Sequence, residues 1–93
     1  MKKYNEQEMI SLLKEKWPKL NLALMSEFTG NKEDRGIWFK SSLIEVIIDE
    51  EVFEIPIIGD MYQTYDKLEQ FLDTYNWMSE PHDSETLMAY PNY

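Results

Sequence analysis

The sequence predicts an α+β fold, and three observations lead to this prediction. Two segments have the spacing of amphipathic helices, one near the start of the chain and one after residue 63. Between and after them lie runs rich in β-branched and aromatic residues, separated by turn residues that predict hairpins. We therefore expect an antiparallel sheet of five to six strands with two flanking helices, in the order α-β-β-β-β-α-β-β.

The strongest structural signal is the run LIEVIIDEEVFEIPII, residues 43–58. A turn at Glu50-Glu51 would give one apolar face and one mostly polar face, as in a half-buried antiparallel pair. The pairs on the apolar face would be Ile48 with Phe53, Val46 with Ile55, and Ile44 with Ile57. Pro56 has no amide donor, so it belongs on an edge or at a non-bonded ladder position. We expect the rest of the chain to pack on this hairpin.

The first helix is expected from Asn5 to Trp17. Asn5 can cap its start, and Glu8 at the third helical position completes a capping box. Pro18 stops the helix, because the residue before a proline disfavours helical geometry. Its apolar face comprises Met9, Ile10, Leu13 and Trp17.

Three further segments precede the central hairpin. Residues 20–28 alternate between apolar and polar positions and predict a strand. Residues 30–36 form a polar loop bounded by glycines, which suits a wide hairpin connection, and residues 37–40 resume a strand. Ser41-Ser42 predicts a bend or bulge, and the alternative is one long bent strand over residues 37–48.

The second helix is expected over residues 64–76, with Thr64 as its cap. Its apolar face comprises Leu68, Phe71, Leu72 and Tyr75. A last hairpin is expected from the strands 77–81 and 86–90, which would place Trp77 near Tyr90 and Ser79 near Met88.

Length and composition restrict the class of protein. A chain of 93 residues has room for one core, so we expect a single domain over residues 1–93. The sequence has no cysteine, which excludes disulfides and thiolate metal sites and fits the cytoplasm. No apolar run approaches the roughly 20 residues of a membrane span, and the first ten residues lack the pattern of a signal peptide.

The charge is divided unevenly along the chain. Residues 1–40 contain eight Lys/Arg and six Asp/Glu, a net charge of +2. Residues 41–93 contain one Lys and twelve Asp/Glu, a net charge of −11, so the whole chain carries −9. An asymmetry of this size predicts a surface of one sign.

Catalytic and ligand-binding motifs are not found in the sequence. His82-Asp83-Ser84 has the residue types of a catalytic triad, but neighbours in sequence cannot align as nucleophile, base and orienting group. The acidic residues lack the pattern of a calcium loop, and the glycines lack that of a phosphate loop. The net negative charge disfavours direct binding to nucleic acid. We therefore expect neither an enzyme, nor a metal site, nor a cofactor.

The acidic residues of the second half are the candidate binding residues. Three share one side of the second helix, at positions i, i+3 and i+7. Five lie on the central hairpin, where alternate residues of a strand point to the same face. The candidates are Glu45, Asp49, Glu50, Glu51, Glu54, Asp66, Glu69 and Asp73. They either only make the protein soluble or form a surface that docks onto a basic partner.

We therefore expect a small, acidic, non-enzymatic protein that binds a basic protein partner. In size and acidity the chain resembles the small inhibitors that phages and mobile elements direct against host nucleases and defence systems. This resemblance of composition implies a nucleic-acid mimic whose partner is a nucleic-acid-binding enzyme. The alternatives are an immunity protein or antitoxin for one dedicated toxin, and a small-ligand module. A homodimer through an exposed sheet edge is a further expectation.

Overall fold

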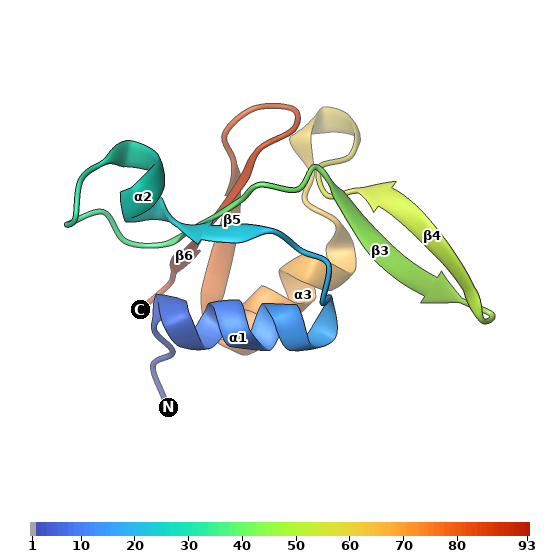
Figure 1. The fold of residues 1–93 in the computed structure, drawn as a ribbon, viewed down its shortest axis with the longest axis horizontal. Coiled ribbons are helices and arrows are strands. Elements are labelled where there is room, and N and C mark those ends of the chain that lie inside the picture. Colours follow the sequence, from blue (N-terminus) through green and yellow to red (C-terminus); the bar gives the residue numbers. More distant parts are fainter. Residues whose placement is uncertain (1) are drawn as a thin grey trace.

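The computed structural model describes residues 2–93 and has an α+β fold, as the sequence predicts (Figure 1). Four strands form one antiparallel sheet in the order β1-β2-β6-β5, and the other two form a separate hairpin, β3-β4. The strands thus divide between two sheets, whereas the sequence predicted a single one. The elements are α1 (Glu6–Lys16), β1 (Leu22–Leu24), α2 (Met25–Thr29), β2 (Ile37–Phe39), β3 (Leu43–Ile48), β4 (Glu51–Pro56), η1 (Asp60–Tyr62), α3 (Asp66–Thr74), β5 (Trp77–Pro81) and β6 (Leu87–Pro91).

The core lies between the four-stranded sheet and the helices α1 and α3. Met9 and Leu13 of α1 and Leu68 and Leu72 of α3 are fully buried, as the apolar spacing of both helices predicts. The sheet contributes Ile37, Phe39, Trp77, Leu87 and Ala89 to the same cluster.

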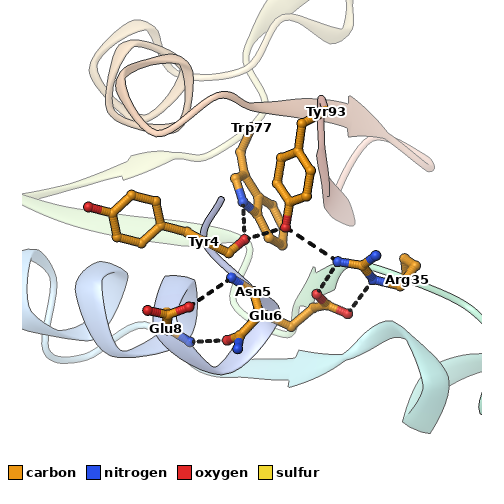
Figure 2. Close-up of polar contacts among 7 residues, drawn as sticks. All are labelled: Tyr4, Asn5, Glu6, Glu8, Arg35, Trp77 and Tyr93. Atoms are coloured by element: carbon orange, nitrogen blue, oxygen red, sulfur yellow. Dashed lines mark hydrogen bonds and ion pairs between the residues drawn. The ribbon is translucent and has the colours of Figure 1, made fainter. Parts of the chain in front are cut away.

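Helix α1 agrees closely with its prediction. The Asn5 side chain accepts a hydrogen bond from the Glu8 amide (2.9 Å), and the Glu8 carboxylate accepts one from the Asn5 amide (3.2 Å) (Figure 2). Helix α3 begins at Asp66, later than predicted, and Thr64 does not cap it. The Thr64 hydroxyl is instead hydrogen-bonded to the Ser79 hydroxyl of β5 (2.8 Å).

The strand predicted over residues 20–28 is correct only in its first part. β1 ends at Leu24, and the one-turn helix α2 follows directly. Gly30 ends α2 in the left-handed conformation (φ 79°), and its amide donates to the Ser26 carbonyl (2.9 Å). β2 ends at Phe39 and β3 begins at Leu43 in the other sheet, so residues 37–48 are not one continuous strand.

The β5-β6 hairpin forms where predicted, but its register differs by one residue. Trp77 pairs with Pro91 and Ser79 with Ala89. The reason is the length of the turn, which comprises residues 82–86. The Asp83 carboxylate accepts hydrogen bonds from the amides of Glu85 (2.8 Å) and Thr86 (2.7 Å) and so keeps Thr86 out of the strand.

The β3-β4 hairpin projects from the rest of the molecule (Figure 1). Its turn is Asp49-Glu50, one residue earlier than predicted, and both residues have positive φ (50° and 67°). The type I′ hairpin turn requires positive φ at both central residues, and aspartate adopts it more readily than glutamate does. The pairs are therefore Ile48 with Glu51, Val46 with Phe53, and Ile44 with Ile55.

Only the base of this hairpin joins the core. Ile44 is 1% exposed, whereas Ile48 is 56% exposed and Phe53 43%. The expectation that the chain packs on this hairpin is therefore wrong. The four-stranded sheet provides the surface on which α1 and α3 pack, because it presents four paired strands and the hairpin presents only two.

A polar network joins the two ends of the chain to the loop before β2 (Figure 2). The Tyr4 carbonyl accepts hydrogen bonds from Trp77 Nε1 (3.0 Å) and from the Tyr93 hydroxyl (2.7 Å). Arg35 donates through Nε and Nη2 to the two carboxylate oxygens of Glu6, both at 2.9 Å. These hydrogen bonds from Arg35 lower the pKa of the Glu6 carboxyl group.

Candidate functional site

The end of the β3-β4 hairpin exposes apolar and acidic side chains together. We call residues 47–54 the hairpin tip. Its four largest apolar side chains are strongly exposed, namely Ile47 (73%), Ile48 (56%), Val52 (58%) and Phe53 (43%). Its four carboxylates are also exposed: Asp49, Glu50, Glu51 and Glu54. Apolar side chains grouped in this way on a projecting element are typical of a binding surface.

Both faces of the hairpin tip carry this mixture, because alternate residues of a strand point to opposite sides. Ile47, Val52 and Glu54 share one face, and Ile48, Glu51 and Phe53 share the other. The six-residue strands extend roughly 20 Å. Only the first part of that length is covered by the core, so the rest meets solvent on both sides.

An open groove of about 470 Å³ lies at the base of the hairpin, beside the end of α1. Trp17, Leu20 and Ile44, all buried, contribute apolar atoms to it. Lys19 Nζ lies 3.0 Å from the Glu45 carboxylate, so the groove contains one ion pair. Lys16, Lys40, Leu43, Ile47 and Glu54 also line it.

A second groove, of about 420 Å³, lies between α3 and β5. The three predicted carboxylates of α3, Asp66, Glu69 and Asp73, all line it. Gln70, Ser79 and Asn92 add polar groups, and Met78 adds an apolar side chain that is 45% exposed. The helical spacing read from the sequence thus gathers these three acids in one place.

The eight predicted residues fall into two groups. Five lie on the hairpin and three in the α3 groove, and neither groove contains residues of both groups. Among residues 2–93, Glu45 is the only one of the eight with a lysine or arginine nitrogen within 4 Å. The other seven carboxylates are exposed.

Sequence reasoning missed the apolar part of the hairpin tip. Ile48 and Phe53 were expected on the apolar face of a half-buried pair, and Ile47 and Val52 were not among the candidate binding residues. The consecutive apolar residues Val46-Ile47-Ile48 and Val52-Phe53 were the available signal. Such runs place apolar side chains on both faces, which does not fit a hairpin with one solvated face.

Neither the described structure nor comparison with known proteins indicates a metal site, a membrane span or a family. Within residues 2–93, no group of three or more His, Cys, Asp or Glu side chains is arranged to hold a metal ion. In the same part of the chain, every helix is too short or too polar to cross a membrane. Searches with protein-family models, against curated proteins and against solved structures gave no match.

Proposed function

We propose that this protein is a non-enzymatic interaction module whose hairpin tip docks onto a basic surface of a partner protein. One observation carries the proposal: a projecting hairpin exposes four large apolar side chains among four carboxylates. Burial of the apolar side chains favours binding, and the carboxylates favour a partner surface that is positively charged.

The two kinds of side chain contribute differently to binding. Full burial of an aliphatic or aromatic side chain is worth about 1.5–3 kcal/mol, so the two on either face of the hairpin tip can anchor a small interface. Exposed carboxylates add less to affinity but accelerate association with a basic surface, and salt weakens this effect. We therefore expect association to slow at high salt while the dissociation rate changes little.

A narrower form of the proposal concerns the identity of the partner. The hairpin tip carries four exposed carboxylates and no lysine or arginine. A nucleic-acid-binding enzyme has basic surfaces that fit such acids. We propose an enzyme of this class, in the cytoplasm, as the partner, because a chain without cysteine suits a reducing compartment.

Quantitative capture from the lysate of the source cells tests the proposal with two charge-reversed variants. One carries Asp49→Lys, Glu50→Lys and Glu51→Lys in the hairpin tip. The matched control carries Asp66→Lys, Glu69→Lys and Asp73→Lys in α3 and has the same net charge. A third variant, Ile47→Ser with Val52→Ser, keeps all charges and removes two exposed apolar side chains.

We expect the hairpin variants to lose at least about tenfold in recovery of the specific partner, a loss of about 1.4 kcal/mol. The α3 variant should retain most of it. Equal losses in the two charge-reversed variants would mean that bulk charge, and not the hairpin, attracts the partner. Full recovery with the Ile47→Ser, Val52→Ser variant would contradict the role of the apolar side chains on that face of the tip.

A further inference from the structure

We propose that the partner adds a β-strand with basic side chains to the free edge of β3. This inference rests on the proposed function and deepens it, because it specifies the backbone geometry of docking. A two-stranded sheet has two edges with unpaired backbone groups, and an added strand satisfies the groups of one edge. The structure distinguishes the two edges.

The hydrogen-bond pattern shows which amides point outward. The Ile57 amide donates to the Ser42 carbonyl (3.0 Å), so residues 42 and 57 form a bonded pair. Bonded and non-bonded pairs alternate in an antiparallel ladder. With the observed register, the backbone groups of Leu43, Glu45 and Ile47 therefore point away from β4. Among residues 2–93, no other segment forms a backbone hydrogen bond with them.

The opposite edge, that of β4, is interrupted. Its outward residues are Val52, Glu54 and Pro56, the residues that face Ile47, Glu45 and Leu43 in the ladder. Pro56 has no amide to donate, and a proline at this position blocks the continuation of a sheet. The β3 edge is complete over the same length, so it is the better template for a third strand.

The β3 edge is also open to solvent. The groove at the base of the hairpin adjoins this strand, and Leu43, Glu45 and Ile47 of β3 line it together with Glu54 of β4. Its three lysines lie outside the hairpin: Lys16 ends α1, Lys19 follows that helix, and Lys40 precedes β3. A strand that enters this groove continues past the hairpin tip, where the charges are all negative.

Charge determines the occupant. Residues 43–56 contain five carboxylates and no lysine or arginine. A second copy of the chain would place two such hairpins side by side, and like charges on neighbouring strands destabilise a sheet. A strand that places lysine or arginine beside the tip instead makes attractive contacts with these carboxylates. We therefore infer a basic strand of another protein, and a second copy is the alternative that the experiment excludes.

A short peptide of alternating lysine and valine serves as the probe, with NMR detection on the full-length protein. At saturating peptide, hydrogen exchange of the Glu45 and Ile47 amides should slow at least about tenfold, because new hydrogen bonds protect them. The amides of Val52 and Glu54 should not change. A peptide of alternating glutamate and valine should not bind, and the protein alone should show no concentration-dependent protection, as a second copy at this edge would cause.

Two proline variants give a matched control. Ile47→Pro removes an outward amide of β3, and Val52→Pro removes the outward amide directly opposite on β4. Both remove an exposed β-branched side chain and neither removes a bond of the ladder, as Pro56 already illustrates. We expect Ile47→Pro to weaken peptide binding at least about tenfold, or about 1.4 kcal/mol, and Val52→Pro, which removes a side chain but no amide of the β3 edge, to weaken it clearly less.

The possible results separate this inference from the proposed function. No peptide binding, unchanged exchange at Glu45 and Ile47, or equal effects of the two prolines would each overturn strand addition. Partner capture by the hairpin tip would survive these results, because it depends on side chains. The exchange measurement uses the unaltered protein, so it decides the matter even if Ile47→Pro unfolds the hairpin.

Discussion

Glu6 shows how a single side chain ties together parts of the chain that are far apart in the sequence. Its carboxylate accepts two hydrogen bonds from Arg35, and its own side chain is only 17% exposed. Arg35 in turn lies 3.5 Å from the Tyr93 hydroxyl, which donates to the Tyr4 carbonyl. The residue therefore supports the contact between α1, the loop before β2 and the end of the chain.

We predict that Glu6→Gln lowers the free energy of unfolding by about 1 kcal/mol, because a paired and mostly covered carboxylate loses its charge while its partner Arg35 stays half-exposed. For a domain of this size, that corresponds to a fall in Tm of about 4–8 °C. Thermal unfolding measures it. Glu15→Gln, an equal charge change at an exposed position of the same helix, is the control and should leave Tm almost unchanged.

The same ion pair predicts a dependence on pH. Hydrogen bonds from Arg35 lower the pKa of Glu6 in the folded protein below its ordinary value of 4.5. The stabilisation is therefore fully present above pH 4.5 and is lost as the pH falls through the lower folded value. Urea unfolding between pH 7 and pH 3 should show that the difference between the natural protein and Glu6→Gln shrinks below about pH 4.5. A constant difference would contradict the assignment.

Two glycines provide a second test at this scale. Gly36 has φ 111°, and a Cβ there would lie 2.6 Å from the Ala89 carbonyl oxygen. Gly30 also has positive φ, but a Cβ there would meet nothing within 4 Å. Gly30→Ala should cost about 1 kcal/mol for backbone strain, and Gly36→Ala at least about 2 kcal/mol because crowding adds to it. Chemical denaturation measures both, and similar losses would refute the close packing at Gly36.

At the scale of elements, the positions of α1 and of both hairpins were predicted correctly, and the registers of the hairpins were not. The capping box of α1 was predicted because Asn5 and Glu8 satisfy each other within one turn. Both hairpins were found, but both registers were wrong. Their registers depend on turn conformations, the positive φ of Asp49 and Glu50 and the hydrogen bonds of Asp83, which the apolar pattern does not specify.

The hairpin tip is an element whose removal should leave the rest intact. Replacing residues 47–52 by Asn-Gly closes the shortened hairpin at the bonded pair Val46–Phe53, with the turn sequence that this geometry favours. Since the deleted side chains are exposed, the free energy of unfolding should change by less than about 1 kcal/mol. Urea unfolding and partner capture measure the outcome. Loss of both the fold and the partner would show that the tip stabilises the domain.

At the scale of the whole molecule, the sequence indicated where charge collects but not how the surface is divided. The eight acids were identified from composition and spacing alone. Their division into two groups was not predictable, because it depends on the hairpin standing apart from the sheet that α3 covers. The apolar half of the candidate site was missed for the same reason. Burial of Ile48 and Phe53 was inferred from the alternation of apolar and polar residues along each strand. This alternation does not show which strands are covered by a second layer of the fold.

The contact between Tyr93 and Tyr4 has a practical consequence. It brings the two ends of the described chain together, and Figure 1 shows them at the far side of the molecule from the β3-β4 hairpin. An affinity handle or fluorophore fused to either end, or a bead that holds the protein by it, will therefore face away from the hairpin. Such an attachment leaves the hairpin tip exposed to solution, where a partner strand or surface can reach it without obstruction.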